Sequence, residues 1–220
     1  MSGVIHDKPP LSFCSALILG AGRSSRMGEP KPLLPLGDQT VIESVIGLFR
    51  GAGVAQIVVV LGHQADLILP RIERLGADSV INARYDEGMF SSVQAGVSRL
   101  DRGCGAFFVL PVDTPLVRPE TLGVLMEAFR KGDVEVCRPS FQGRCGHPPL
   151  ISAALIPAIR DFEGEGGLRA LLALHKERVK EVPVEDPGIL LNLNTREDYA
   201  AALERISRPD PGSPLPSASR

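Results

Sequence analysis

The sequence predicts an α/β fold, a Rossmann-like and mostly parallel sheet with helices on both faces. Two observations carry this prediction. Residues 57–61 form a continuous β-branched and apolar run, which is typical of strands that helices cover on both sides. Such runs alternate with helical periodicity over the first 130 residues, and this alternation predicts βαβ units with right-handed crossovers.

The individual elements follow from apolar runs, helix caps and turn residues. Strands are expected at residues 15–19, 57–61, 79–82 and 106–110, and helices at 40–49, 66–75, 90–100 and 118–130. Beyond these, extended pieces are expected at 135–139, 149–152, 179–184 and 189–193, and helices at 153–162 and 168–177. A last helix over 196–206 is capped by Thr195, with Asp198 in its first turn.

The chain is long enough, at 220 residues, to bury a core without metal or disulfide staples. We expect a flexible N-terminus over residues 1–14, a single domain over 15–206, and a disordered, proline-rich tail over 207–220. We also expect a monomer.

Composition excludes several classes of function. Lys and Arg total 24 against 26 Asp and Glu, so the basic surplus of a nucleic-acid-binding protein is missing. No apolar run reaches the length of a membrane span, and the N-terminus has no signal-peptide core. The four cysteines form no Cys-x-x-Cys pair and predict reduced thiols of a cytoplasmic protein rather than disulfides or a zinc site.

A glycine-rich loop directly follows the first predicted strand. Gly20 and Gly22 let backbone N–H groups approach a phosphate, and the cations Arg23, Arg26 and Lys31 follow closely. A glycine turn with solvated arginines is the alternative interpretation. Because ligands bind at the carboxyl edge of such sheets, the pattern favours a triphosphate site.

Two common phosphate loops do not match this segment. Ser25 stands where the dinucleotide fingerprint has its third glycine, and Pro30 and Pro32 flank the lysine, unlike a P-loop.

Asp113 follows the apolar strand expected at 106–110 and reaches the same edge of the sheet. Mg²⁺ prefers one or two carboxylates together with phosphate oxygens, so Asp113 is the expected metal anchor. A turn-forming Asp before Thr-Pro is the alternative.

The segment Leu-Gly-Ala-Gly-Arg-Ser-Ser-Arg-Met-Gly-Glu-Pro-Lys resembles the nucleotidyltransferase signature Leu-x-x-Gly-x-x-x-Arg-Met-Gly-x-x-Lys. More narrowly, residues 16–203 are similar to the molybdenum cofactor cytidylyltransferases, which join CMP from CTP to molybdopterin. Supporting motifs lie at residues 82–92, 110–116, 143–148, 166–169 and 192–195. Gly146-His147-Pro148 points to the molybdopterin branch. The resemblance implies the nucleotide-diphospho-sugar transferase type of fold, Mg²⁺ as cofactor, and CTP or another nucleoside triphosphate as substrate.

The residues and the resemblance together assign roles. The catalytic residues would be Arg26, Lys31 and Asp113; the nucleotide-binding residues Leu19, Gly20, Ala21, Gly22, Arg23, Lys31, Asn82, Ser91, Ser92 and Asp113; the metal ligands Asp113 and Asn194; and the acceptor-binding residues Arg144, His147 and Arg169.

Structural alternatives stand beside several of these roles. Ser91 and Ser92 suit helix capping, and Asn194 suits a turn into the last helix. His147 suits a structural histidine, and Arg169 suits a surface position after a glycine hinge.

The base specificity rests on Ala21, whose methyl group narrows the loop where it passes the base and so favours CTP. Asn192-Leu-Asn194-Thr195 resembles the guanylyl branch instead, because cytidylyltransferases commonly have Asp-Ile-Asp-Thr there. The alternatives are therefore a guanylyltransferase, a sugar- or polyol-phosphate nucleotidyltransferase, or a non-catalytic carrier that delivers finished cofactor to a molybdenum hydroxylase.

Overall fold

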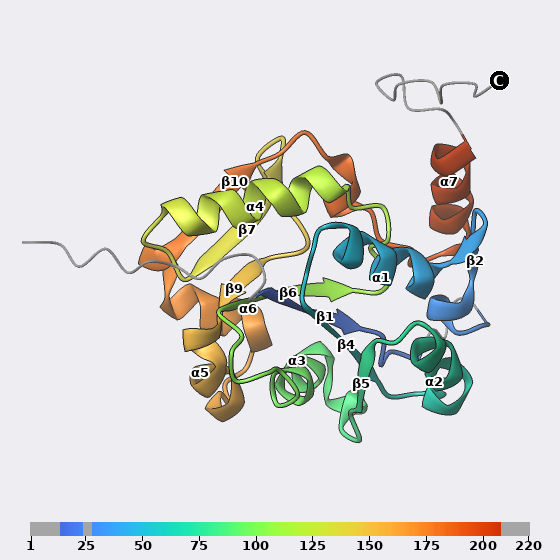
Figure 1. Ribbon diagram of the computed structural model, residues 1–220, viewed down its shortest axis with the longest axis horizontal. Coiled ribbons are helices and arrows are strands. Elements are labelled where there is room, and N and C mark those ends of the chain that lie inside the picture. Colours follow the sequence, from blue (N-terminus) through green and yellow to red (C-terminus); the bar gives the residue numbers. More distant parts are fainter. Residues whose placement is uncertain (1–13, 24–27, 208–220) are drawn as a thin grey trace, which may run out of the picture.

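The computed structural model describes residues 14–23 and 28–207. Its main sheet has the strand order β10-β7-β9-β6-β1-β4-β5, and β8 pairs with β7 (Figure 1). The strands are β1 (Cys14–Leu19), β4 (Gln56–Leu61), β5 (Asp78–Ile81), β6 (Ala106–Pro111), β7 (Val136–Phe141), β8 (Arg144–Cys145), β9 (Leu150–Ser152) and β10 (Val179–Pro183). Strand β9 runs antiparallel to β6 and β7, whereas β1, β4, β5 and β6 are mutually parallel.

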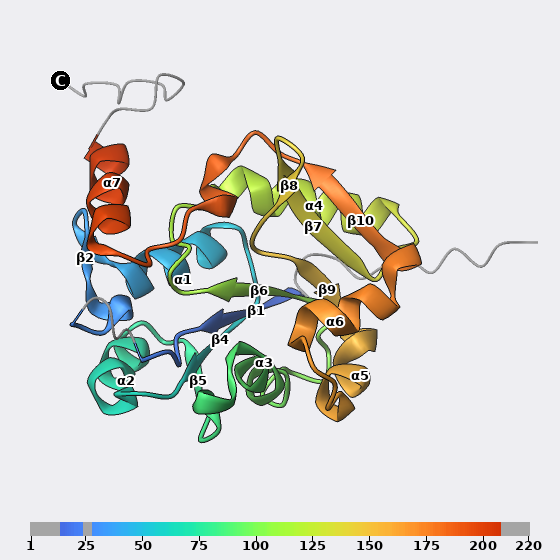
Figure 2. The same ribbon diagram turned by 180° about the vertical axis from the view of Figure 1, so that it is seen from behind.

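Helices cover both faces of this sheet, which confirms the predicted fold class (Figures 1 and 2). They are α1 (Val41–Gly51), α2 (Ala65–Arg74), α3 (Met89–Val97), α4 (Pro119–Lys131), α5 (Ile156–Asp161), α6 (Gly167–Leu174) and α7 (Arg196–Ser207). A two-stranded hairpin of β2 (Pro35–Leu36) and β3 (Gln39–Thr40) precedes α1. Helix α7 lies beside β2, where Tyr199 donates a hydrogen bond to the Pro35 carbonyl.

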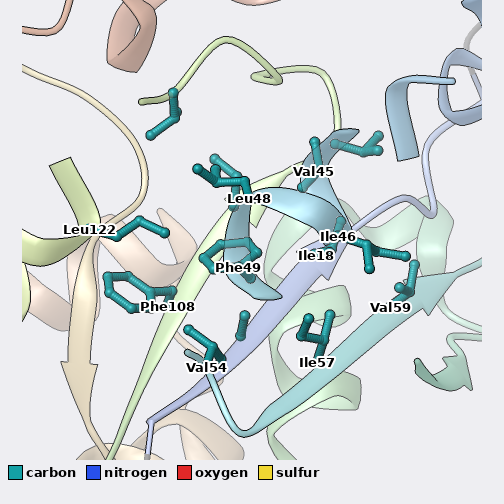
Figure 3. Close-up of a cluster of buried hydrophobic side chains, with 14 of the residues drawn as sticks. Ile18, Val45, Ile46, Leu48, Phe49, Val54, Ile57, Val59, Phe108 and Leu122 are labelled. Carbon is teal, nitrogen blue, oxygen red and sulfur yellow. The ribbon is translucent and has the colours of Figure 1, made fainter. Parts of the chain in front are cut away.

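Each face of the sheet has its own hydrophobic core. Phe108 points to the face covered by α1, α2 and α4, where its ring lies 5.7 Å from that of Phe49 (Figure 3). Phe107, the preceding residue, points to the opposite face, covered by α3, α5 and α6. This alternation follows from the period of two residues in a strand, and it explains why the central strands carry apolar residues at nearly every position.

The expected extended piece at 189–193 is wrong. Residues Pro187–Leu190 form a short 3₁₀ helix, η6, because the Asp186 side chain accepts the Gly188 N–H and Pro187 occupies the first turn. The expected helices at 153–162 and 168–177 each consist of two shorter pieces. These are η4 (Ala153–Leu155) with α5, and α6 with η5 (Lys176–Arg178).

The termini differ slightly from expectation. Cys14 is the first residue of β1 and Ser207 the last of α7, although the prediction placed them in the flexible N-terminus and the tail; the rest of those two segments lies outside the described residues. Thr195 and Asp198 cap α7 reciprocally, side chain to backbone N–H, as predicted. Within residues 14–23 and 28–207, none of the helices has the length and apolar character needed to cross a membrane.

Candidate active site

A cavity of about 400 Å³ lies where β1 and β6 end. The two strands are parallel neighbours, so their carboxyl ends meet at one edge of the sheet, where α/β proteins bind ligands. The cavity is lined by Leu19, Gly20, Ala21, Gly22, Lys31, Pro32, Tyr85, Gly88, Met89, Ser92, Pro111, Val112, Asp113 and Asn194. Lys31 and seven further residues that the sequence assigned to the nucleotide or the metal therefore line one cavity. The seven are Leu19, Gly20, Ala21, Gly22, Ser92, Asp113 and Asn194.

Lys31, Asp113 and Asn194 meet at one end of this cavity. Lys31 Nζ donates to Asp113 Oδ2 at 2.9 Å and to Asn194 Oδ1 at 3.3 Å. The Lys31 and Asp113 side chains are 14% and 25% exposed, so solvent screens their attraction only in part. The cluster joins residues that lie 82 and 163 positions apart in the sequence.

The donor set of this cluster suits a hard cation. Asp113 offers a carboxylate and Asn194 an amide oxygen, and both already face the positive charge of Lys31. Among the described residues no group of three or more His, Cys, Asp or Glu side chains is placed to hold a metal by itself. Two protein oxygens are what Mg²⁺ or Mn²⁺ takes when phosphates and water complete the coordination.

The glycine loop is held against strand β4 at its base. Gly20 N donates to the Val60 carbonyl at 2.8 Å, and the Ala21 carbonyl accepts the His63 N–H at 3.2 Å. The Gly20 amide is therefore committed to the sheet and does not face a phosphate, in contrast to the expected role of its backbone. Gly22 is exposed, and Ala21 is a buried residue that lines the cavity. Arg26 lies outside the described residues.

Arg23 is not among the residues that line the cavity. Its guanidinium donates to both carboxylate oxygens of Asp86, at 2.8 and 2.7 Å, and lies 5.8 Å from the centre of the Tyr85 ring. This bidentate pair holds the pKa of Asp86 below its usual value. The pair links the glycine loop to η3 (Tyr85–Glu87), and an Arg23 that binds a triphosphate must first leave Asp86.

Asn82 supports the start of α3 from below. Its amide nitrogen donates to Ser91 Oγ at 2.8 Å and to Ser92 Oγ at 3.1 Å, and its amide oxygen accepts the Arg84 N–H. Gly88, with φ of +105°, is the N-cap of α3, so the two serines do not cap the helix as the alternative interpretation had it. Ser92 lines the cavity, whereas Asn82 and Ser91 do not.

A second cavity of about 820 Å³ adjoins the first, and Met89 lines both. His147 and Arg169 lie in its wall, as does Gly166 at the start of α6. Arg144 is exposed on β8 and is not among the lining residues. The cavity also contains charged and polar side chains that sequence reasoning missed, namely Glu87, Arg138, Cys145, Lys176 and Glu181.

His147 is a buried histidine with one nitrogen, Nδ1, that has no hydrogen-bond partner. Burial lowers the pKa of His147, and the positive charge of Arg138 lowers it further. A hydrogen bond to the Val109 backbone and the negative charge of Asp113 raise the pKa, but by less than burial lowers it. The ring is therefore neutral near pH 7. His147 lines the second cavity, although the unpartnered Nδ1 itself is buried.

Some of the missed residues carried a signal in the sequence. Tyr85 and Met89 lie inside the 82–92 motif, but no pattern marked their side chains as cavity walls. Arg138 and Glu181 stand on β7 and β10, which pair in parallel with these two residues in register. That neighbourhood depends on the strand order, which local patterns do not encode.

The fold and the site together define a nucleotidyltransferase, an enzyme whose glycine loop, lysine and carboxylate face one cavity at the end of the first strand. Residues 16–181 match the family of MobA-like NTP transferase domains, and the chain belongs to this family.

Three relatives illustrate the range of the similarity. The chain is 30% identical over 169 residues to nicotine blue oxidoreductase of Paenarthrobacter nicotinovorans, covering 74% of this chain and 82% of that protein. It is 27% identical to a probable molybdenum cofactor guanylyltransferase of Bacillus mycoides, covering 90% and 99%. The crystal structure of Rv0371c from Mycobacterium tuberculosis in complex with manganese has a TM-score of 0.72 at 26% identity and covers 87% and 97%. Bifunctional GlmU proteins also match, but the chain spans only 26% of the one from Gloeobacter violaceus.

Proposed function

We propose that this protein transfers CMP from CTP to a phosphorylated acceptor of the molybdopterin type, releasing pyrophosphate. One observation carries the proposal. Lys31, Asp113 and Asn194 converge in a cavity bordered by the glycine loop, and a larger cavity adjoins it at Met89. Two adjoining cavities suit two substrates that must be joined. The relative described as a molybdenum cofactor guanylyltransferase supports this class of acceptor.

The reaction needs positioning and charge neutralisation rather than a covalent intermediate. An oxygen of the acceptor phosphate attacks the α-phosphorus of the nucleotide, the bond to the bridging oxygen breaks, and pyrophosphate leaves with the electron pair. Lys31 would stabilise the negative charge that develops on the leaving pyrophosphate. Arg26 would add a second cation from the glycine loop.

Asp113 and Asn194 would hold Mg²⁺ against the α-phosphate. A divalent ion there would polarise the phosphoryl oxygen and orient the acceptor. Manganese in the Rv0371c complex, a related protein, supports a divalent ion for this chain. His147 and Arg169, together with Arg138 and Lys176, supply the hydrogen-bonding and positive groups that an anionic acceptor requires in the second cavity.

The preference for cytosine is the finer part of the proposal. Ala21 stands in the wall of the nucleotide cavity, and its methyl group leaves less room than glycine, which favours a single ring. Asn192 Oδ1 accepts a hydrogen bond from Thr114, and Asn194 Oδ1 accepts one from Lys31, so both oxygens already have partners in the region proposed for metal and phosphate. The likeness of that motif to the guanylyl branch therefore weighs less than Ala21.

A cross-screen tests the proposal. The full chain is incubated with Mg²⁺ and each of CTP, GTP, ATP or UTP, together with molybdopterin, a sugar phosphate or a polyol phosphate. Pyrophosphate release is measured and the product is identified by mass spectrometry. We expect CTP with molybdopterin to give the highest kcat/KM. Because one relative is named an oxidoreductase, NADPH is included as well; its oxidation without any pyrophosphate release contradicts the proposal.

The screen also separates the alternatives. Preference for GTP replaces the cytidylyl assignment with a guanylyl one, and turnover of a sugar or polyol phosphate replaces the acceptor. Binding of the finished dinucleotide without turnover by any pair favours a carrier that serves a molybdenum hydroxylase.

A further inference from the structure

Residues 186–194 form most of the connection from β10 to α7. Asn194, at the end of this segment, lines the first cavity, and the start of the segment is fixed to α4. Asp186 is 2% exposed. Its Oδ2 accepts the Arg118 N–H at 2.8 Å and the Thr121 hydroxyl at 2.7 Å, and its Oδ1 accepts the Gly188 N–H at 2.8 Å. A buried carboxylate with three donors at the N-terminal end of a helix is a firm anchor.

The middle of the connection packs so closely against its neighbours that two glycine positions have no room for a β-carbon. A β-carbon at Gly188 would lie 1.9 Å from the Leu116 carbonyl oxygen, and one at Gly146 would lie 2.2 Å from the Ile189 carbonyl oxygen. The Ile189 carbonyl also accepts the N–H of His147 at 2.9 Å. The connection therefore touches the loop after β6 on one side and the loop that carries His147 on the other.

The end of the connection is fastened to the residues of the cation cluster. Leu193 N donates to the Asp113 carbonyl at 2.7 Å, and Thr114 Oγ1 donates to Asn192 Oδ1 at 2.8 Å. Thr114 is fully buried. Asn194 follows directly, and its N–H bonds the Asn192 carbonyl at 3.0 Å. Two bonds thus tie the residues before Asn194 to Asp113 and Thr114: the backbone of Leu193 to the backbone of Asp113, and the side chain of Asn192 to that of Thr114.

We infer that Thr114 is a positioning residue: its hydrogen bond to Asn192 sets the distance between Asp113 and Asn194 and thereby the affinity for the divalent ion. The inference rests on the metal dependence in the proposed function. It also gives Asn192 a role that differs from metal binding, since its oxygen accepts the Thr114 hydroxyl. Without the Thr114–Asn192 hydrogen bond, Asp113 keeps its position but Asn194 becomes more mobile. The affinity for the divalent ion then falls although both ligands are still present.

The test compares three variants of the full chain. Thr114→Val replaces the hydroxyl by a methyl group of similar size, and Thr114→Ser keeps the donor. Thr121→Val is the matched control, because it removes a buried hydroxyl that bonds the same connection at its far end, at Asp186. Mn²⁺ binding is measured by electron paramagnetic resonance with CTP present, against CTP alone as the blank, and the melting temperature of each variant is recorded.

We expect Thr114→Val to weaken Mn²⁺ binding at least fivefold and to raise the Mg²⁺ concentration for half-maximal turnover by a similar factor. Thr114→Ser and Thr121→Val should stay within twofold of the unaltered protein, although Thr121→Val lowers the melting temperature about as much as Thr114→Val. Equal binding in Thr114→Val, or an equal loss in Thr121→Val, overturns the positioning role while the proposed function stands. If the unaltered protein itself binds no Mn²⁺, the metal dependence in the proposed function fails, and the inference fails with it.

Discussion

The ammonium of Lys31 lies 2.9 Å from Oδ2 of Asp113, within the group of oxygens that a divalent ion would use. The lysine therefore occupies, as an internal cation, the neighbourhood that the metal must enter. Nucleotide and metal are expected to arrive together, because the phosphates attract Lys31 and free Asp113 at the same time.

Removing the internal cation should have opposite effects on metal binding and on turnover. Lys31→Met keeps the length of the side chain but not its charge, so a divalent ion no longer competes with an ammonium for Asp113. We expect the affinity of the nucleotide-free protein for Mn²⁺ to rise roughly tenfold, since like charges this close repel strongly, while kcat/KM for the nucleotide falls.

The Lys31 comparison needs a control for charge alone. Lys131→Met removes a lysine on α4 that pairs with Glu127 on the surface, and should leave both quantities unchanged. If Lys31→Met binds Mn²⁺ no better than the unaltered chain, the lysine does not compete with the metal ion for Asp113.

Asp113→Asn should abolish turnover with little change in folding. The side chain is partly exposed and belongs to the cavity rather than to the core, and the substitution keeps its shape. We expect kcat to fall by about 10²-fold or more, as for removal of one group that stabilises transition-state charge, with a similar melting temperature. Asp38→Asn, in an exposed turn, is the control. Normal turnover by Asp113→Asn would remove the metal role.

Ala21→Gly should reduce the preference for CTP. We expect the unaltered protein to favour CTP over GTP by at least about tenfold in kcat/KM, where 1.36 kcal/mol corresponds to one decade, and the variant to lose most of this difference. CTP and GTP compete in one reaction and both products are quantified, so that any loss of folded protein cancels. If the ratio of CTP product to GTP product is unchanged in Ala21→Gly, another residue determines the choice of base.

His147 should make the fold less stable in mild acid. Burial lowers its pKa in the folded state below the usual value of 6.5, so the unfolded chain binds the proton more readily. The free energy of unfolding therefore falls as the pH drops through that value and is fully retained above it. Urea unfolding at pH 5.5 and 7.5 measures the loss, and His147→Gln should show a smaller one. Identical losses in both proteins would mean that His147 titrates alike in the folded and unfolded chain.

The periodic parts of the fold could be predicted from the sequence, because burial on both faces of the central strands leaves a continuous apolar run. Phe107 and Phe108 show this, since each fills a different core. The course of residues 186–194 could not be predicted. Apolar Ile189 and Leu193 suggest a strand, but the Asp186 side chain and the close approach at Gly188 impose a 3₁₀ turn.

The site could be predicted where one motif follows one strand. Leu19, Lys31 and Asp113 share the cavity as the motifs imply. Arg23 could not be placed, because Asp86, its partner, lies 63 residues further along the chain. Arg144, on β8, was singled out by its nearness to His147 in sequence, whereas Arg138, on the neighbouring strand β7, is the arginine that lines the cavity.

Met89 belongs to the walls of both cavities, and this shared wall has a consequence for product release. A molecule that joins nucleotide and acceptor would span both cavities, without the contacts of the departed pyrophosphate. When one half detached, the other would hold it at high local concentration for rebinding. Such rebinding would slow the dissociation of the joined product. We expect departure of the product, rather than bond formation, to limit the rate of the cycle.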